Sequence, residues 1–423
     1  MKSAAQRIIE VWADWMGVPK PRRLGTLYAT PSRAKEIFSF EYDAAWLKDG
    51  LAQSLDPALR FFSGPQYPGA EKMNFGLFLD SSPDRWGRFL MKRREAQAAR
   101  DEGRAVRTLY ESDFLLGVYD AHRMGALRFK LVPAGPFLDD NRDYASPPWA
   151  SLRELEQAAS EVERPDAEKA GEYKRWLRML IAPGGSLGGA RPKAGVVDAQ
   201  GHLWIAKFPS ATDEIDWGAW EMAVHALAKK SGVLVSEAQA RTFNTKRHTF
   251  LTKRFDRVGQ GRIHFASAMT LLGRTDGDDA SNGASYLELA ELLIQYGAQV
   301  DADLEQLWRR IVFSICVSNA DDHLCNHGFL LTPNGWTLSP AYDMNPDPDS
   351  EGLKLNISDV DNAQDLGLAR EVAPFFRVKA KRAQAIIAEV VSAVRQWRDE
   401  ARHVGITSAE MDEVEPAFRI ALA

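Results

Sequence analysis

The residues from Val317 to Leu331, VSNADDHLCNHGFLL, constrain this chain most, because five polar or ionisable side chains crowd into the eight residues after Asn319, before an apolar run. The apolar run before them is typical of a helix, which we expect to end at Asn319. The apolar run after them is typical of a strand, and Pro333-Asn334-Gly335 predicts a hairpin turn into a second strand. Asp343 follows five residues after that second strand.

This order of elements brings together the side chains that phosphoryl transfer from ATP requires. Asp321 and Asn326 are five residues apart, the same offset as in the H-R-D-x-x-x-x-N loop of protein kinases. We expect Asp321 to position the attacking hydroxyl and to accept its proton. Asn326 and Asp343 offer hard oxygen ligands, so we expect them to hold Mg²⁺ on the phosphates.

Two other interpretations of this loop stay open from the residues alone. Asn and Asp favour helix ends and turns, so the loop could be a capped turn without chemistry. His323 and His327 could bind zinc, although an H-x-x-x-H pair without a Glu after the first His, or without paired cysteines, is a weak signal.

Residues upstream of the loop supply the other parts that a kinase needs. The segment His202–Phe208 alternates as a strand and contains Lys207, which could reach the α- and β-phosphates. Glu221 lies fourteen residues after Lys207 in the helix-like WGAWEMAVHALAKKSG, where a lysine-pairing Glu is expected. Before the strand, Ser186–Lys193 (SLGGARPK) offers flexible backbone N–H groups and two cations for an anion.

Composition narrows the class of protein. The 423 residues are 45% hydrophobic and 26% charged, which is typical of a globular protein. The net charge of −5 gives no global positive field for nucleic acid, so we expect DNA to be reached only through a partner. The sequence has no signal-peptide core and no window of ~20 apolar residues for a membrane span, so we expect a cytoplasmic protein without membrane contact.

Three segments differ in texture and together predict an α+β fold. Residues 1–145 mix strand-like runs with helices, as an N-terminal α/β subdomain would. Residues 146–265 hold the glycine-rich loop and the lysine strand, and they include two expected helices, the second over 167–180. Residues 266–423 are expected to be mainly helical, with one apolar helix face running from Ala383 to Trp397.

Taken in order, these motifs resemble the HipA family, the serine/threonine protein kinases that act as toxins in bacterial toxin–antitoxin operons. The resemblance covers most of the chain. Its motifs are LGTLY, FSFEYDAAWL, FGLFLDSSPDRWGRFLMKRR, SLGGARPKAGV, IAKFPS, LTKRFDR, SNADDHLCN and LSPAYDM. It implies a protein-kinase-like two-part fold, with an N-terminal part that holds the nucleotide-binding strands, a mainly helical C-terminal part, and ATP in the cleft between them.

The resemblance also implies roles for individual residues. Asp321 matches the catalytic Asp, Asn326 and Asp343 match the Mg²⁺ ligands, and Ser186 matches the autophosphorylated serine of the phosphate-binding loop. The segment 252–256 matches the hinge, whose backbone would hold adenine. The residues that the resemblance places at the nucleotide are Lys193, Lys207, Glu221, Phe255, Asp256, which would approach the ribose, and His323.

The sequence departs from the family pattern at two positions. Many members carry Lys immediately before the metal-binding Asn, where this chain has Cys325. The loss of that cation is expected to weaken a phosphate contact and to lower the rate. Lys253 stands where an acidic hinge residue is common, with little expected effect because hinge contacts are made largely by the backbone.

The expected function is therefore an ATP- and Mg²⁺-dependent serine/threonine protein kinase that arrests growth. The resemblance implies a HipB-like DNA-binding antitoxin as a partner, and a cytosolic translation protein such as an aminoacyl-tRNA synthetase as the substrate. One alternative is a small-molecule phosphotransferase, which would share the acidic loop. Another is an inactive nucleotide-binding module that tethers an antitoxin to DNA, a hypothesis motivated by Cys325.

Overall fold

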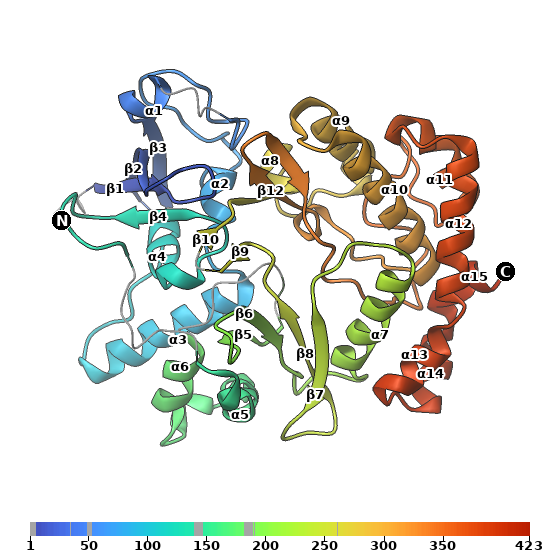
Figure 1. Cartoon of the computed structure of the whole chain (residues 1–423). Coiled ribbons are helices and arrows are strands. Elements are labelled where there is room, and N and C mark those ends of the chain that lie inside the picture. Colours follow the sequence, from blue (N-terminus) through green and yellow to red (C-terminus); the bar gives the residue numbers. More distant parts are fainter. Residues whose placement is uncertain are drawn as a thin grey trace. The chain divides into compact units, whose positions relative to one another are not determined.

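A computed structural model describes residues 6–33, 35–48, 53–138, 147–181, 189, 191–259 and 261–423. The chain divides into two compact units (Figure 1). Unit 1 comprises residues 1–206 and 256–266, and unit 2 comprises residues 207–255 and 267–423. Each unit is therefore assembled from two separate stretches of the chain.

Unit 1 combines strands and helices. Its first sheet is four-stranded and antiparallel where register is defined, in the order β3-β2-β1-β4. The elements of this unit are β1 (Arg7–Ala13), β2 (Arg22–Ser32), β3 (Lys35–Tyr42), α1 (Ala44–Lys48), α2 (Gly76–Leu79), α3 (Arg85–Asp101), α4 (Glu111–Leu116), β4 (Leu127–Lys130), α5 (Leu152–Glu163), α6 (Tyr173–Ile181), β5 (Lys193–Val197), β6 (Leu203–Lys207), which ends one residue into unit 2, β9 (Arg257–Val258) and β10 (Gly261–Arg262).

An aromatic cluster on one face of this sheet forms the core of unit 1. Phe38 and Phe40 alternate with more exposed residues along β3, as the two-residue period of a strand requires. The ring of Phe40 lies 5.7 Å from that of Phe78, and Phe78 in turn lies 6.2 Å from Phe129 of β4. These contacts pack α2 against the sheet.

Unit 2 is mainly helical and carries the acidic loop. Its elements are α7 (Trp217–Lys230), β7 (Ala238–Thr242), β8 (His248–Lys253), α8 (Ala268–Leu271), α9 (Tyr286–Tyr296), α10 (Val300–Val317), β12 (Gly328–Thr332), β13 (Gly335–Leu338), α11 (Leu366–Val372), α12 (Ala380–Val394), α13 (Trp397–Val404), α14 (Ser408–Val414) and α15 (Arg419–Leu422); β11 (Phe265–Ser267) ends at its boundary.

Helix α10 is the centre of unit 2. From Leu307 to Val317 every residue is buried, which is typical of a helix that is covered on all sides by other elements. Helix α12 packs along it (Figure 1). Because α10 leads directly into the acidic loop, this packing fixes the point from which the loop starts.

Several elements expected from the sequence are present. The helix before the loop ends at Val317, two residues before the expected end. The hairpin is formed by β12 and β13, with Thr332 opposite Gly335 across a two-residue turn. The positive φ of Gly335, 132°, is one that a residue with a Cβ rarely adopts, so glycine suits this turn.

Other expectations differ from the structure. The helix expected over 167–180 is a short 3-10 turn at Ala167–Lys169 followed by α6, so that prediction was wrong in its extent. The apolar face from Ala383 to Trp397 is shared by two helices, because α12 ends at Val394. The boundaries of the two compact units differ from those of the three segments expected from the sequence. The three segments group the chain by expected role, and that division stays a prediction.

No helix among the described residues combines the length and the apolar character that crossing a membrane requires.

We expect Trp397→Ala to destabilise the protein strongly. Trp397 is 1% exposed, and its ring stacks on Phe418 at 4.4 Å. Truncation of such a ring leaves a cavity, so the free energy of unfolding should fall by about 3–5 kcal/mol. Urea denaturation measures this change. Val360→Ala is the control, because Val360 is 87% exposed and its truncation should alter stability by less than about 0.5 kcal/mol.

Candidate active site

The acidic loop connects the end of α10 to the start of β12. Ser318 caps α10 in the left-handed conformation, with φ of 49°, and turns the chain out of the helix. A short 3-10 turn, Leu324–Asn326, follows, and His323 caps it by accepting a hydrogen bond at Nδ1 from the backbone N–H of Cys325 at 3.2 Å. The loop is thus a sequence of capped turns with little freedom.

Asp321 and Asn326 are joined through the backbone of the loop. The carbonyl oxygen of Asp321 accepts from Asn326 Nδ2 at 2.9 Å and from the N–H of His323 at 2.9 Å. Asp321 is exposed as a residue, although its carboxyl group is partly covered. Partial burial of the carboxyl raises the pKa of Asp321, His323 opposes this, and the charge of Asp343 raises the pKa further.

Lys207 lies between two carboxylates of unit 2. Its Nζ lies 2.6 Å from Glu221 Oε1 of α7 and 2.7 Å from Asp343 Oδ1. Burial alone would lower the pKa of Lys207, but the charges of Asp343 and Glu221 outweigh burial and raise it. The lysine is therefore a fixed cation at the end of β6.

Asp343 adopts an unusual backbone conformation. Its φ is 60°, in the left-handed region, which Asp tolerates better than most residues but which still costs free energy. Lys207 holds the carboxylate of Asp343 in place. The side chain of Asp343 therefore contacts Lys207 from a backbone conformation that is strained.

The oxygens of Asn326 and Asp343 suit a hard cation. Asn326 Oδ1 is buried and has no hydrogen-bond partner in the part of the chain that the structure describes. The amide nitrogen of the same side chain is the atom that donates to Asp321. An amide oxygen and a carboxylate are ligands that Mg²⁺ accepts alongside nucleotide phosphates. Among the described residues, no group of three or more His, Cys, Asp or Glu side chains lies close enough together to hold a metal ion.

Tyr342 links the expected hinge to the acidic loop. Its ring lies 5.6 Å from that of Phe255, and its hydroxyl donates to the carbonyl of Cys325 at 2.6 Å. The thiol of Cys325 lies 3.6 Å from the sulfur of Met269. Cys325 thus packs against a thioether at the position where many relatives of the expected family carry a cation.

Two of the expected nucleotide-binding residues have structural partners in unit 1. Lys193 Nζ lies 2.9 Å from Asp84, and both side chains are at most 4% exposed. Asp256 is fully buried, lies 2.6 Å from Arg257 Nη1 and accepts from the N–H of Gly125 at 2.9 Å. Their roles at a nucleotide stay predictions, and Ser186 lies outside the described residues.

Asp322 is a residue of the loop that was not expected from the sequence to belong to the site. Asp322 is buried behind the loop, where its Oδ2 accepts from Tyr286 at 2.6 Å and from Ser314 at 3.2 Å. The offset to Asn326 selected Asp321 over the adjacent Asp322, but nothing in the sequence gave Asp322 a role of its own.

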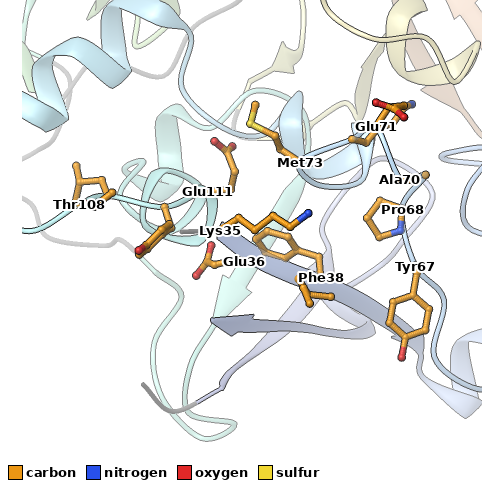
Figure 2. Close-up of a pocket in the computed structure, with 15 residues that line it drawn as sticks. Lys35, Glu36, Phe38, Tyr67, Pro68, Ala70, Glu71, Met73, Thr108 and Glu111 are labelled. Atoms are coloured by element: carbon orange, nitrogen blue, oxygen red, sulfur yellow. The ribbon is translucent and has the colours of Figure 1, made fainter. Parts of the chain in front are cut away.

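A cavity of about 510 Å³ lies within unit 1, apart from these residues (Figure 2). It is bordered by β3 from Lys35 to Phe38 and by segments 67–73 and 108–111. Two lysines and three glutamates border it, so its charge favours no single class of ligand.

Comparison with known proteins identifies relatives by family, sequence and fold. The family of the HipA-like C-terminal domain matches residues 185–398. A chain of the Shewanella oneidensis MR-1 toxin–antitoxin complex of HipA, HipB and operator DNA is 17% identical, with a TM-score of 0.66 over 98% of this chain and 96% of that one. This similarity confirms the expected α+β, HipA-like fold.

Two further similarities are more limited. Y4mE of Sinorhizobium fredii, a candidate kinase, is 28% identical over 148 residues, which is 33% of each protein. The match therefore spans only a third of the length of that relative. The proinflammatory kinase CtkA of Helicobacter pylori covers 54% of this chain and 94% of its own, with 13% identity and a TM-score of 0.34.

We expect Lys193→Met to destabilise the protein, because it removes the cation that lies 2.9 Å from the buried carboxylate of Asp84. Removal of one partner from a buried pair costs about 3–5 kcal/mol, which denaturation by urea measures. The matched control is Lys169→Met, because Lys169 lies 3.0 Å from Asp166 in an exposed pair and should contribute less than about 1 kcal/mol. Equal stability of the two variants would contradict a structural role for Lys193.

Proposed function

The chain belongs to the family of the HipA-like C-terminal domain, and from this premise we propose that it is an ATP- and Mg²⁺-dependent serine/threonine protein kinase that acts as a growth-arresting toxin. The observation that carries the proposal is the placement of Lys207 between Glu221 and Asp343 within unit 2. A lysine paired with a helical Glu, together with a metal-binding Asp, is the arrangement that kinases use around ATP phosphates.

The residues of unit 2 divide the chemistry between them. Asp321 takes the proton of the substrate hydroxyl as the hydroxyl oxygen bonds to the γ-phosphorus, and the bond from that phosphorus to the bridging oxygen breaks to release ADP. Lys207 places a fixed positive charge near the phosphates. Asn326 Oδ1 and the carboxylate of Asp343 would hold Mg²⁺, which neutralises phosphate charge when bound.

The proposed partner is a HipB-like DNA-binding antitoxin. The similar Shewanella chain comes from a complex that contains HipB and operator DNA. With a net charge of −5, this chain lacks the positive field that direct DNA binding favours, so we propose that it reaches DNA only through the antitoxin. The proposed substrate is a cytosolic translation protein, with an aminoacyl-tRNA synthetase as the first candidate.

Incubation of the purified protein with γ-labelled ATP, Mg²⁺ and a cell lysate tests the proposal. Label on serine or threonine of a discrete protein supports the kinase. Label in a metabolite would instead indicate a small-molecule phosphotransferase. Label in neither would indicate an inactive nucleotide-binding module and would overturn the proposal. The exposed position of Asp321 favours an active phosphotransferase over the inactive module, because a substrate hydroxyl must reach the general base.

We expect Asp321→Asn to lower the rate of phosphoryl transfer by at least ~10²-fold, because the amide cannot accept the proton. ATP affinity should be nearly unchanged, since Asp321 contacts no phosphate in this proposal. Asp343→Asn is the comparison, and it should lose Mg²⁺-dependent ATP affinity as well as rate. Turnover and nucleotide titration with and without Mg²⁺ measure both effects. A near-normal rate in Asp321→Asn would remove its assigned role.

We further propose that the protein phosphorylates its own Ser186. A phosphate adds roughly −1.5 to −2 charge at neutral pH, which would repel the phosphates of ATP. After incubation with ATP and Mg²⁺, intact-mass measurement should show one added phosphate, and peptide mapping should place it at Ser186. ATP affinity should fall in step, and both changes should be absent in Asp321→Asn. Unaltered ATP affinity after phosphorylation would contradict this mechanism of inactivation.

A further inference from the structure

Asp322 lies directly after Asp321, but its side chain is on the opposite side of the loop. Asp321 is exposed, whereas Asp322 is 5% exposed and faces the interior of unit 2. The planar peptide between the two residues contains both the carbonyl group of Asp321 and the N–H group of Asp322, so these groups move together. A contact that fixes Asp322 therefore also restricts the backbone of Asp321.

Two helices hold the carboxylate of Asp322 by hydrogen bonds, and His327 lies beside it. Tyr286, the first residue of α9, donates its hydroxyl to Oδ2 at 2.6 Å, and Ser314 of α10 donates to the same oxygen at 3.2 Å. On the other side, His327 Nε2 lies 3.0 Å from Oδ1. The carboxylate thus connects the loop to α9 and α10, and it lies close to His327, the last residue of the loop.

The cluster stabilises the charged form of Asp322. Burial alone would raise the pKa of this carboxyl, but His327, Tyr286 and Ser314 together lower it. The guanidinium of Arg310, also buried in α10, contributes a cation nearby. An ionised carboxylate accepts stronger hydrogen bonds than a neutral group, so this anchor is firm.

A small space behind the loop is bordered by both Asp322 and Asn326. A cavity of about 10 Å³ is bordered by Asp322, His327 and Asn326, among others. This is about the smallest volume that admits one water molecule. Asp322 and Asn326 therefore border the same small cavity, together with apolar side chains such as Phe313 and Met344.

From these contacts we propose that Asp322 is a positioning residue for phosphoryl transfer. Its carboxylate holds the loop so that the backbone carbonyl of Asp321 meets the amide of Asn326, which sets the directions of both side chains. Asp322 itself touches neither nucleotide nor substrate. The inference rests on the proposed kinase function for its catalytic consequence, while its effect on the loop is independent of that function.

Asp322→Asn tests the proposal, because it keeps the volume and removes the charge. Loss of a residue that orients catalytic groups typically costs 10–100-fold in activity, so we expect kcat to fall by about that factor while KM for ATP changes less than about threefold. Tyr286→Phe, which removes only the hydroxyl, should lower kcat less. Because the two residues share a hydrogen bond, their effects should be non-additive in the double variant.

Asp303→Asn is the matched control. Like Asp322, Asp303 has a buried carboxylate, but it lies on α10. It accepts a hydrogen bond from Thr337 at 2.9 Å, away from the loop. Both Asp→Asn changes should lower thermal stability, but only Asp322→Asn should change kcat. A fall in kcat of equal size in the two variants would reduce Asp322 to a general structural residue and would overturn the proposal.

Amide hydrogen exchange separates this inference from the kinase assignment. In Asp322→Asn, exchange in the peptide that spans residues 318–328 should become faster, while exchange in the hairpin and α12 stays as in the parent protein. Asp303→Asn should leave the loop peptide unaltered. Unchanged loop exchange in Asp322→Asn would overturn the positioning role, whether or not the parent protein transfers phosphate. A parent protein without phosphotransfer, but with the expected exchange, would overturn only the kinase function.

Discussion

The pairing of Lys207 with Glu221 and Asp343 is the interaction on which the candidate site depends. It joins the end of β6, helix α7 and the segment after β13, three pieces that are far apart in the sequence. A buried ammonium is tolerated only when opposite charges offset its desolvation, and here two carboxylates do so. The contact with Lys207 also holds Asp343 in its left-handed conformation, so the ion pair offsets part of the free-energy cost of that backbone strain.

The acidic loop is likewise held in place by contacts from several directions. Its outward residue, Asp321, is held by bonds to its carbonyl from His323 and Asn326. Its inward residue, Asp322, is held by side chains of the surrounding helices. A loop that is bound on both sides loses little conformational entropy when a substrate arrives, and such preorganisation is the main contribution a protein makes to phosphoryl transfer.

The order of motifs along the chain made the main parts of the candidate site predictable from the sequence. The offset between Asp321 and Asn326, the hairpin turn before Asp343, and the strand that ends in Lys207 are local patterns, and the structure has each of them. The pairing of Lys207 with Glu221 was expected from their order alone. The local pattern was less reliable around Ala167–Lys169, which forms a 3-10 turn ahead of α6 instead of the start of one continuous helix.

The sequence by itself determined the kinds of side chain, their order and the local elements that carry them, because strand and helix periodicity and turn chemistry act over a few residues. Only the tertiary structure decided which of two adjacent acids faces inward, and that Lys193 pairs with Asp84 in a buried contact. These outcomes depend on neighbours more than a hundred residues away in the case of Lys193, and on helices α9 and α10 in the case of Asp322. Burial and pairing of charge are properties of the packed interior, and no short stretch of sequence contains them.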